Sequence, residues 1–180
     1  MSRIVLGVCG SVAAYKAADL ARRLTVAGHA VDVVMTRAAT EFVRPLTFRS
    51  LTGREAHSDL FADQHDDIRH ITLAQRADLV VVAPATAATI ARLANGAADD
   101  YLSTLCLALR QQPRLLAPAM NTAMYDHPAV QANLARLIDF GWRVIEPADG
   151  LLACGQVGRG ALAPVDTIVA AVTAALAAAD

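Results

Sequence analysis

Short apolar runs alternate along this chain with longer stretches in which apolar residues recur at helical spacing. The runs are apolar almost throughout and are bounded by turn residues, which is typical of strands buried on both faces of a parallel sheet. They span residues 4–8, 30–35, 79–83, 115–117 and 142–146, and the last of these is the last clear strand. We therefore expect a sheet whose two faces are both covered.

The stretches between the runs predict helices, because they carry one apolar face and end at glycine or proline. The expected helices span 12–27, 36–43, 45–51, 68–74, 90–93, 99–110, 129–140 and 164–178. Strands that alternate with helices predict one α/β domain over residues 1–180, with a doubly wound, mostly parallel, Rossmann-like sheet. Two segments lack such a pattern. We expect 54–65 to be irregular with at most one short strand, and the glycine-rich 151–162 to be a slack connection or a lid.

Small and polar residues follow these strands directly. In doubly wound sheets, ligands bind outside the carboxyl ends of the strands. We expect a small-molecule site at that edge, built from Gly10, Ser11, Thr36, Thr86 to Thr89 and Asn121, with Cys154 further along the loop after the last strand. The small residues at 86–89 would let a flat or phosphorylated ligand approach the backbone, and a plain threonine cap of the next helix is the alternative.

The turn after the first strand is suited to a phosphate. Ser11 is expected to cap the helix at 12–27, whose first N–H groups and dipole attract an anion. A serine that only caps its helix explains the turn equally well. The turn contains Gly10 but not GxGxxG, and Thr36 stands where a dinucleotide site would carry an acidic residue. Both departures argue against NAD and leave a mononucleotide or FMN open.

The composition limits the class of protein. The chain has 180 residues, of which 55% are hydrophobic, enough for one buried core. Its net charge of −1 leaves no basic excess to neutralise nucleic-acid phosphates. Without a membrane-spanning run or a signal-peptide pattern, we expect a cytoplasmic protein with no membrane partner. Cys9, Cys106 and Cys154 lack disulfide or zinc spacing, so we expect no metal site.

Few reactive groups are available for chemistry. The sequence has no paired carboxylates, Walker motif or GxSxG elbow, and it offers one imidazole at His70, the Asn121 amide and the Cys154 thiol. This inventory suits proton movement beside a cofactor that performs the difficult chemistry. Local sequence alone favours a core position for His70, between two isoleucines, over a catalytic one. His57 and His65 are expected on the surface.

Several motifs in the same order are shared with a known family. They are Gly10 to Lys16, His70-Ile71, Pro84 to Thr89, Pro118 to Met124, and Ala153-Cys154-Gly155 with Gly158 and Gly160. Over essentially its whole length the chain resembles the homo-oligomeric flavin-containing cysteine decarboxylases. The resemblance implies that FMN is held by Gly10, Ser11, Val12 and Thr36, and that Thr86, Ala87, Ala88, Thr89 and Ala119 line the flavin.

The resemblance also implies an activity, the decarboxylation of 4′-phosphopantothenoylcysteine to 4′-phosphopantetheine in coenzyme A biosynthesis. In that reaction the flavin oxidises the cysteinyl unit to a thioaldehyde, CO₂ leaves, and the resulting enethiolate is reduced again. His70 would be catalytic beside the flavin and Cys154 would be the acid. Asn121 would bind the substrate carboxylate, with Ala153 also in the substrate site. The family implies a homotrimer or homododecamer with FMN at a subunit interface.

Alternatives within and beyond this activity stay open. One is a decarboxylase of a peptide's C-terminal cysteine, and another is a non-catalytic FMN-binding regulator, although regulatory members carry acidic tails that this chain lacks. Flavin prenyltransferases resemble the chain less at His70 and Asn121. Three positions depart from the family pattern: Ala88 replaces Asn or Asp, Tyr125 replaces Trp, and Pro164 replaces an acid.

Overall fold

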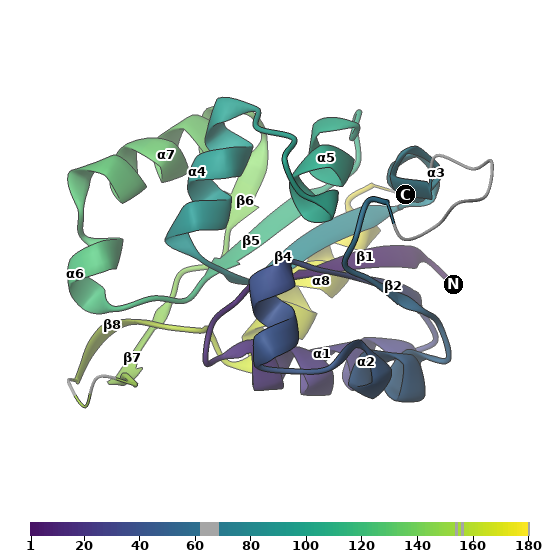
Figure 1. Cartoon of the computed structure of the whole chain (residues 1–180), viewed down its shortest axis with the longest axis horizontal. Coiled ribbons are helices and arrows are strands. Elements are labelled where there is room, and N and C mark those ends of the chain that lie inside the picture. Colours follow the sequence, from purple (N-terminus) through teal and green to yellow (C-terminus); the bar gives the residue numbers. More distant parts are fainter. Residues whose placement is uncertain (62–68, 154, 156, 180) are drawn as a thin grey trace.

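A computed structural model describes residues 1–61, 69–153, 155 and 157–179. Its centre is a six-stranded parallel sheet with the order β3-β2-β1-β4-β5-β6 (Figure 1). The strands are β1 (Arg3–Val8), β2 (Ala30–Met35), β3 (Ala56–His57), β4 (Leu79–Ala85), β5 (Arg114–Pro118) and β6 (Trp142–Val144). This is the doubly wound Rossmann order, in which the direction of winding reverses between β1 and β4. The predicted fold class is confirmed.

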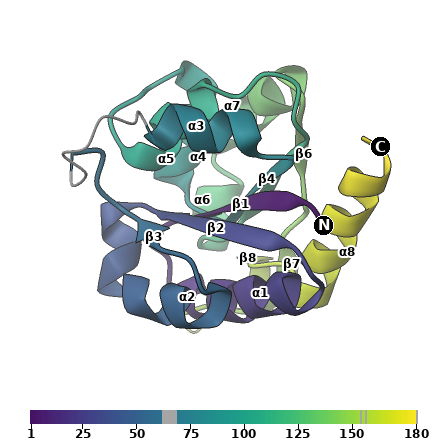
Figure 2. The same ribbon diagram turned by 90° about the vertical axis from the view of Figure 1, so that its right-hand side faces the viewer.

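Helices cover both faces of the sheet (Figure 2). One face carries α1 (Ala14–Val26), α2 (Pro45–Thr52) and α8 (Val165–Ala177). The other carries α3 (Arg69–Arg76), α4 (Ala87–Asn95), α5 (Tyr101–Leu107) and α7 (Pro128–Asp139). A short 3₁₀ helix, η1 (Arg37–Glu41), follows β2, and the one-turn helix α6 (Thr122–Tyr125) follows β5. No helix in the described part of the chain is long and apolar enough to cross a membrane.

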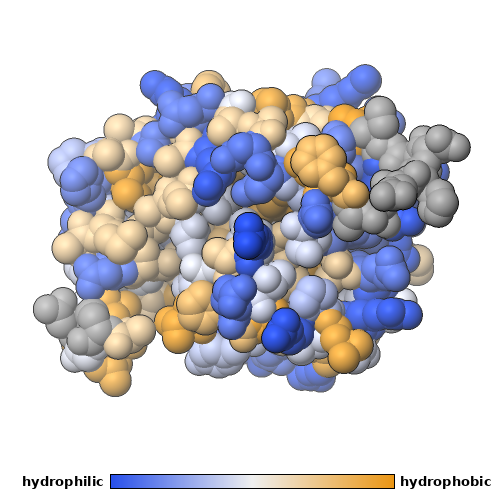
Figure 3. All heavy atoms as spheres, in the orientation of Figure 1, coloured by the Kyte–Doolittle hydropathy of each residue, from blue (hydrophilic) through white to orange (hydrophobic). Residues whose placement is uncertain are grey.

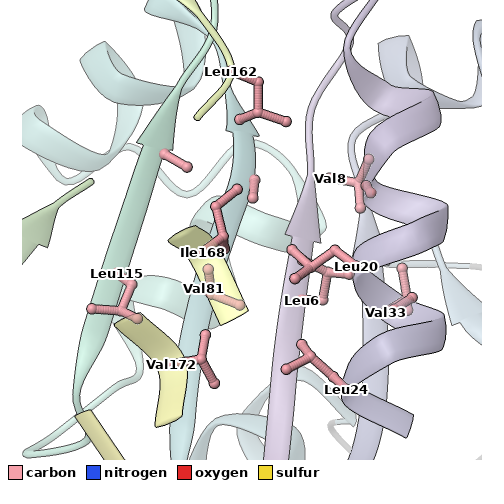
Figure 4. Close-up of a cluster of buried hydrophobic side chains, with 14 of the residues drawn as sticks. Leu6, Val8, Leu20, Leu24, Val33, Val81, Leu115, Leu162, Ile168 and Val172 are labelled. Atoms are coloured by element: carbon pink, nitrogen blue, oxygen red, sulfur yellow. The ribbon is translucent and has the colours of Figure 1, made fainter. Parts of the chain in front are cut away.

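The hydrophobic core lies in two layers, one on each side of the sheet. Leu6 and Val8 of β1 point towards Leu20 and Leu24 of α1 (Figure 4). Their neighbour Val5 packs into the opposite layer. Successive residues of a strand point to opposite faces, so a strand covered on both sides must be apolar throughout. This explains why the runs lack alternation.

The segment after β6 differs from the prediction. Residues 142–146 are not the last strand, because β7 (Ala148–Leu151) and β8 (Val157–Ala161) pair as an antiparallel hairpin outside the main sheet. Figure 1 shows this hairpin beside α6. The expectation of a slack connection at 151–162 is therefore wrong for its second half. The hairpin is rich in glycine and mostly exposed, so its sequence carries no apolar alternation from which strands are recognised.

The irregular stretch at 54–65 contains the short strand β3, as expected. His57 within it is half-buried and stacks on Tyr101, with 5.5 Å between ring centroids, so its assignment to the open surface is wrong. The packing of α5 against this edge of the sheet covers it. His65 lies outside the described residues.

Candidate functional site

A cleft of about 740 Å³ opens at the carboxyl ends of the central strands. The face of the molecule in Figure 3 intersperses hydrophobic with hydrophilic side chains and has no single extended patch of either kind, so the surface pattern alone marks no site. The cleft is lined by Gly10, Ser11, Thr36, Arg37, Ala38, Glu41, Thr86, Ala87, Ala88, Thr89, Arg92, Asp99, Asp100, Ala119, Met120 and Met124. It lies at the edge where doubly wound sheets bind ligands.

Gly10 allows the turn after β1 to lie against η1. A Cβ at this position would lie 2.4 Å from the Cβ of Ala38 and 2.8 Å from its carbonyl carbon. Real Cβ atoms do not approach other atoms so closely, so a larger residue would push η1 away from the turn. The glycine therefore fixes the distance between two walls of the cleft.

Ser11 does not cap α1, which corrects the prediction. The helix starts at Ala14 with Ala13 at the cap position and without a side-chain cap. The Ser11 Oγ instead accepts a hydrogen bond from the Ala13 N–H at 3.2 Å, within a turn that precedes the helix. Serine forms such local turns readily, so the helix begins later than its apolar pattern suggests. Ser11 still lines the cleft.

The threonines after β2 and β4 both cap helices. Thr36 Oγ1 accepts from the Ala39 N–H at 3.3 Å, and Thr86 Oγ1 accepts from the Thr89 N–H at 3.4 Å. The threonine cap expected as the alternative at 86–89 is thus present, and Thr36 caps η1 in the same way. It does not exclude ligand binding, because the first N–H groups of a capped helix remain directed outward with the positive end of the dipole.

Charged residues in the cleft were missed by the sequence reasoning. Arg37, Glu41, Arg92, Asp99 and Asp100 all line it. Arg92 Nε pairs with Asp99 Oδ1 at 3.0 Å. Arg37, by contrast, makes no ion pair with any described residue. Its position directly after Thr36 at a strand exit was the signal that could have identified it.

Asn121 is held in place by its own helix cap. Its Oδ1 accepts from the Ala123 N–H at 2.8 Å at the start of α6. The preceding Met120 donates its backbone N–H to the Gly160 carbonyl oxygen of β8 at 2.9 Å. The strand exit that carries Asn121 is therefore fixed from both sides, by α6 and by the hairpin.

A second pocket of about 360 Å³ lies between the start of α1 and the hairpin. It shares Ser11, Ala119 and Met120 with the first cleft. Its remaining described lining residues are Val12, Ala13, Tyr15, Lys16, Leu151, Leu152, Ala153, Gly160, Ala161 and Leu162. Val12 and Ala153 thus lie here and not in the first cleft. Cys154 lies outside the described residues.

His70 does not line either cavity of the single chain. It lies on α3, half-buried, with its ring edge-on to Tyr101 at 6.2 Å between centroids. The structure therefore brings together the predicted residues of the strand exits, except for Asn121, which lines neither cavity, and it leaves His70 apart from them. The local prediction of a packed histidine fits this geometry.

Two cysteines are structural groups of the core. Cys9 is fully buried beneath the cleft, and burial raises its thiol pKa to about 11. Burial also raises the pKa of the Cys106 thiol. Both therefore stay protonated at neutral pH. Among the described residues, no group of three or more His, Cys, Asp or Glu could hold a metal ion.

Comparison with known proteins identifies relatives over the whole fold. The Flavoprotein family model matches residues 1–177. The chain is 48% identical over 169 residues to a probable phosphopantothenoylcysteine decarboxylase of Streptococcus mutans, covering 93% of this chain and 94% of that protein. It is 49% identical over 167 residues to the coenzyme A biosynthesis bifunctional protein CoaBC of Bacillus subtilis. That match covers 92% of this chain but only 41% of the bifunctional protein.

Solved structures share the fold. The FMN-dependent cysteine decarboxylase SpaF superposes with a TM-score of 0.87 at 33% identity, over 99% of this chain and 97% of that one. A variant of PPC decarboxylase complexed with pantothenoylaminoethenethiol gives a TM-score of 0.85 at 30% identity, over 96% and 97%. These two structures match 99% and 96% of this chain, so the match extends over almost all of it.

Proposed function

This chain belongs to the Flavoprotein family, and from that premise we propose that it decarboxylates 4′-phosphopantothenoylcysteine to 4′-phosphopantetheine with bound FMN. The observation that carries the proposal is the meeting of two cavities at Met120, next to Asn121. The larger cavity, of about 740 Å³, would hold the flavin, and the smaller, of about 360 Å³, would hold the substrate. The similarity to a probable phosphopantothenoylcysteine decarboxylase, over nearly the full length of both chains, supports the same activity.

The first cleft suits FMN by its small lining residues and by its polar groups. Gly10 lets η1 approach the turn, and alanines at 38, 87, 88 and 119 leave room for a flat ring system. Arg37, directly after Thr36, supplies positive charge for a phosphate. Gly10, Ser11 and Thr36 would hold the phosphate and ribityl chain, and Thr86 to Thr89 with Ala119 would line the ring. Ala88 contributes only its backbone and a methyl group.

The residues of the chain have separate tasks in the reaction. Bound FMN would supply reversible two-electron oxidation of the cysteinyl CH₂–SH unit, which makes the neighbouring carboxylate able to leave as CO₂. Asn121, whose Oδ1 accepts from the Ala123 N–H at the start of α6, would bind the substrate carboxylate through its side-chain amide. Cys154 is proposed as the acid, because a free thiol is mostly protonated at neutral pH.

We further propose a homotrimer or homododecamer with the cofactor at a subunit interface. His70 does not reach the cleft of its own chain, so a catalytic His70 would act in a cleft completed by a neighbouring copy. Exposed apolar side chains that line the cavities, Val12, Tyr15 and Met124, suit coverage by such a copy. Light scattering during size-exclusion chromatography tests the assembly, and a monomeric active protein would contradict it.

The substrate could also be a cysteine-terminated peptide, because a cysteine decarboxylase matches the fold as well as a PPC decarboxylase does. The decisive experiment compares CO₂ release by the purified chain from 4′-phosphopantothenoylcysteine and from such a peptide. We expect a yellow protein that acts on the first substrate. A colourless protein that binds no added FMN would overturn the proposal. We expect Cys154→Ser to release CO₂ but to accumulate the enethiolate, and normal product would remove Cys154 from the mechanism.

A further inference from the structure

Lys16 is the one lysine in a chain whose other basic residues are arginines. It lies in the first turn of α1, is half-buried, and lines the second pocket. Its ammonium group makes no hydrogen bond or ion pair with the residues that the structure describes. A partly buried charge without a partner is costly, so its position calls for a ligand of opposite charge.

The nearest acid along the helix is already paired. Asp19 lies one turn after Lys16 and binds two arginines of the same helix, Arg23 Nε at 2.7 Å and Arg22 Nη2 at 3.2 Å. Arg23 also pairs with Asp166 of α8, and partly exposed ion pairs of this kind contribute little. Lys16 instead faces the cavity between α1 and the hairpin.

The second pocket presents this charge in apolar surroundings. Among its described lining residues, Lys16 is the only charged one, and Ser11 and Tyr15 are the only others with polar side chains. Apolar walls weaken screening by water, so the attraction for an anion is stronger than at an open surface. The first turn of α1 adds the positive end of the helix dipole. The pocket thus suits a ligand with an apolar body and one strongly anionic end.

We propose that the second pocket binds the phosphorylated end of the substrate and that Lys16 binds its phosphate. This inference rests on the proposed function and adds the part of the site that selects the substrate. The reacting cysteinyl end would lie near Met120 and Asn121, where the two cavities meet. The rest of the substrate would extend from there towards α1. A cysteine-terminated peptide lacks such a phosphate, so Lys16 distinguishes the two substrate classes.

The phosphate bound by Lys16 is assigned to the substrate and not to FMN. Both molecules carry a phosphate monoester, and one lysine could bind either. Lys16 lines the second pocket and is absent from the lining of the first cleft. Arg37 has the opposite distribution, because it lines the first cleft alone. Each cavity therefore has its own cation for its own phosphate.

The test measures kcat/KM for 4′-phosphopantothenoylcysteine and for pantothenoylcysteine, which lacks the phosphate. A hydrogen-bonded ion pair to phosphate corresponds to about 10- to 100-fold in affinity. We expect Lys16→Gln to lower kcat/KM for the phosphorylated substrate by about that factor, mainly through KM. Turnover of pantothenoylcysteine and the dissociation constant of FMN should stay unchanged. Lys16→Arg should restore most of the preference.

Arg22→Gln is the matched control, because it removes an exposed cation from the same helix. It should leave the ratio of the two kcat/KM values at the wild-type level. Equal losses for both substrates in Lys16→Gln would show that Lys16 supports the fold or the chemistry, and would overturn the proposal. Weaker FMN binding with an unchanged ratio would assign Lys16 to the cofactor. A wild-type protein that turns over neither substrate would instead refute the proposed function and the substrate assignment with it.

Discussion

The backbone N–H of Met120 donates a hydrogen bond to the carbonyl oxygen of Gly160 at 2.9 Å. This bond joins the exit of β5 to the hairpin, two segments that lie far apart in the sequence. The hairpin is also fixed at its outer side, where Arg159 pairs with Glu146 and lies over the ring of Tyr125 at 5.4 Å. The proposed carboxylate-binding Asn121 therefore follows a residue whose backbone is held by tertiary contacts.

Gly160→Ala should detach the hairpin from Met120. Gly160 has a φ of +141°, and a Cβ there would lie 2.3 Å from the Met120 carbonyl oxygen. We expect a loss of about 1–3 kcal/mol in the free energy of unfolding, measured by urea denaturation, together with lower decarboxylase activity. Gly150→Ala in the same hairpin is the control, since its Cβ would meet Ala161 at an ordinary 3.7 Å. Equal effects of the two variants would contradict the close approach at Gly160.

Gly10→Ala should weaken FMN binding. The added methyl group would collide with Ala38 and displace η1, which carries Arg37. Overpacking of this kind costs about 1–3 kcal/mol, so we expect about tenfold weaker binding or more in a titration followed by flavin fluorescence. Adding Ala38→Gly should recover part of the affinity, because it removes the nearest atom but leaves the backbone of residue 38. Unchanged affinity in Gly10→Ala would show that this turn does not shape the flavin site.

Substitutions at Asn121 should separate its capping role from its binding role. Aspartate caps helices as well as asparagine does, so Asn121→Asp should keep the free energy of unfolding within about 0.5 kcal/mol. Its negative charge would repel the substrate carboxylate, and we expect kcat/KM to fall about 100-fold or more. Asn121→Ala should instead destabilise the protein by about 0.5–2 kcal/mol. Wild-type activity in Asn121→Asp would show that the substrate carboxylate does not bind at this position.

The buried Cys9 thiol should make stability depend on alkaline pH. Burial raises its pKa from 9.0 to about 11 in the folded chain. Because the folded pKa lies above the unfolded one, the contribution of the protonated thiol is complete below about pH 9 and is lost as the pH rises through about 11. The shift corresponds to about 2–3 kcal/mol. Urea unfolding from pH 8 to pH 11 should show a shallower decline for Cys9→Ala than for the wild type.

Other groups that titrate at alkaline pH do not affect the comparison of Cys9→Ala with the wild type. Burial and Glu146 raise the pKa of Tyr125 as well, and Cys106 shifts in the same direction, but both groups are present in the two proteins compared. In a Cys154→Ser background, neither Cys9 nor Cys106 should react with a thiol reagent at pH 8 until the chain unfolds. Parallel stability curves for wild type and Cys9→Ala would contradict the assigned pKa.

The sequence by itself determined the sheet and the edge at which its site lies. Strands covered on both faces must be apolar throughout, and this leaves a local signal at 4–8 and 79–83 that needs no tertiary information. Parallel strands also direct all their exits to one edge. The small and polar residues at Gly10, Thr36 and Thr86 could therefore be assigned to a common site before their distances were known.

Only the tertiary structure decided which residues share a cavity. Gly160 approaches the backbone of Met120, a residue that lines both cavities, and Gly10 approaches Ala38 in the same way. Such contacts join segments distant in the sequence and depend on the absence of a Cβ, which leaves no periodic pattern. For the same reason the hairpin was not recognised, Lys16 had no evident role, and the distance of His70 from the cleft could not be seen. Local periodicity reports which face of an element is buried, whereas a site depends on what that face is buried against.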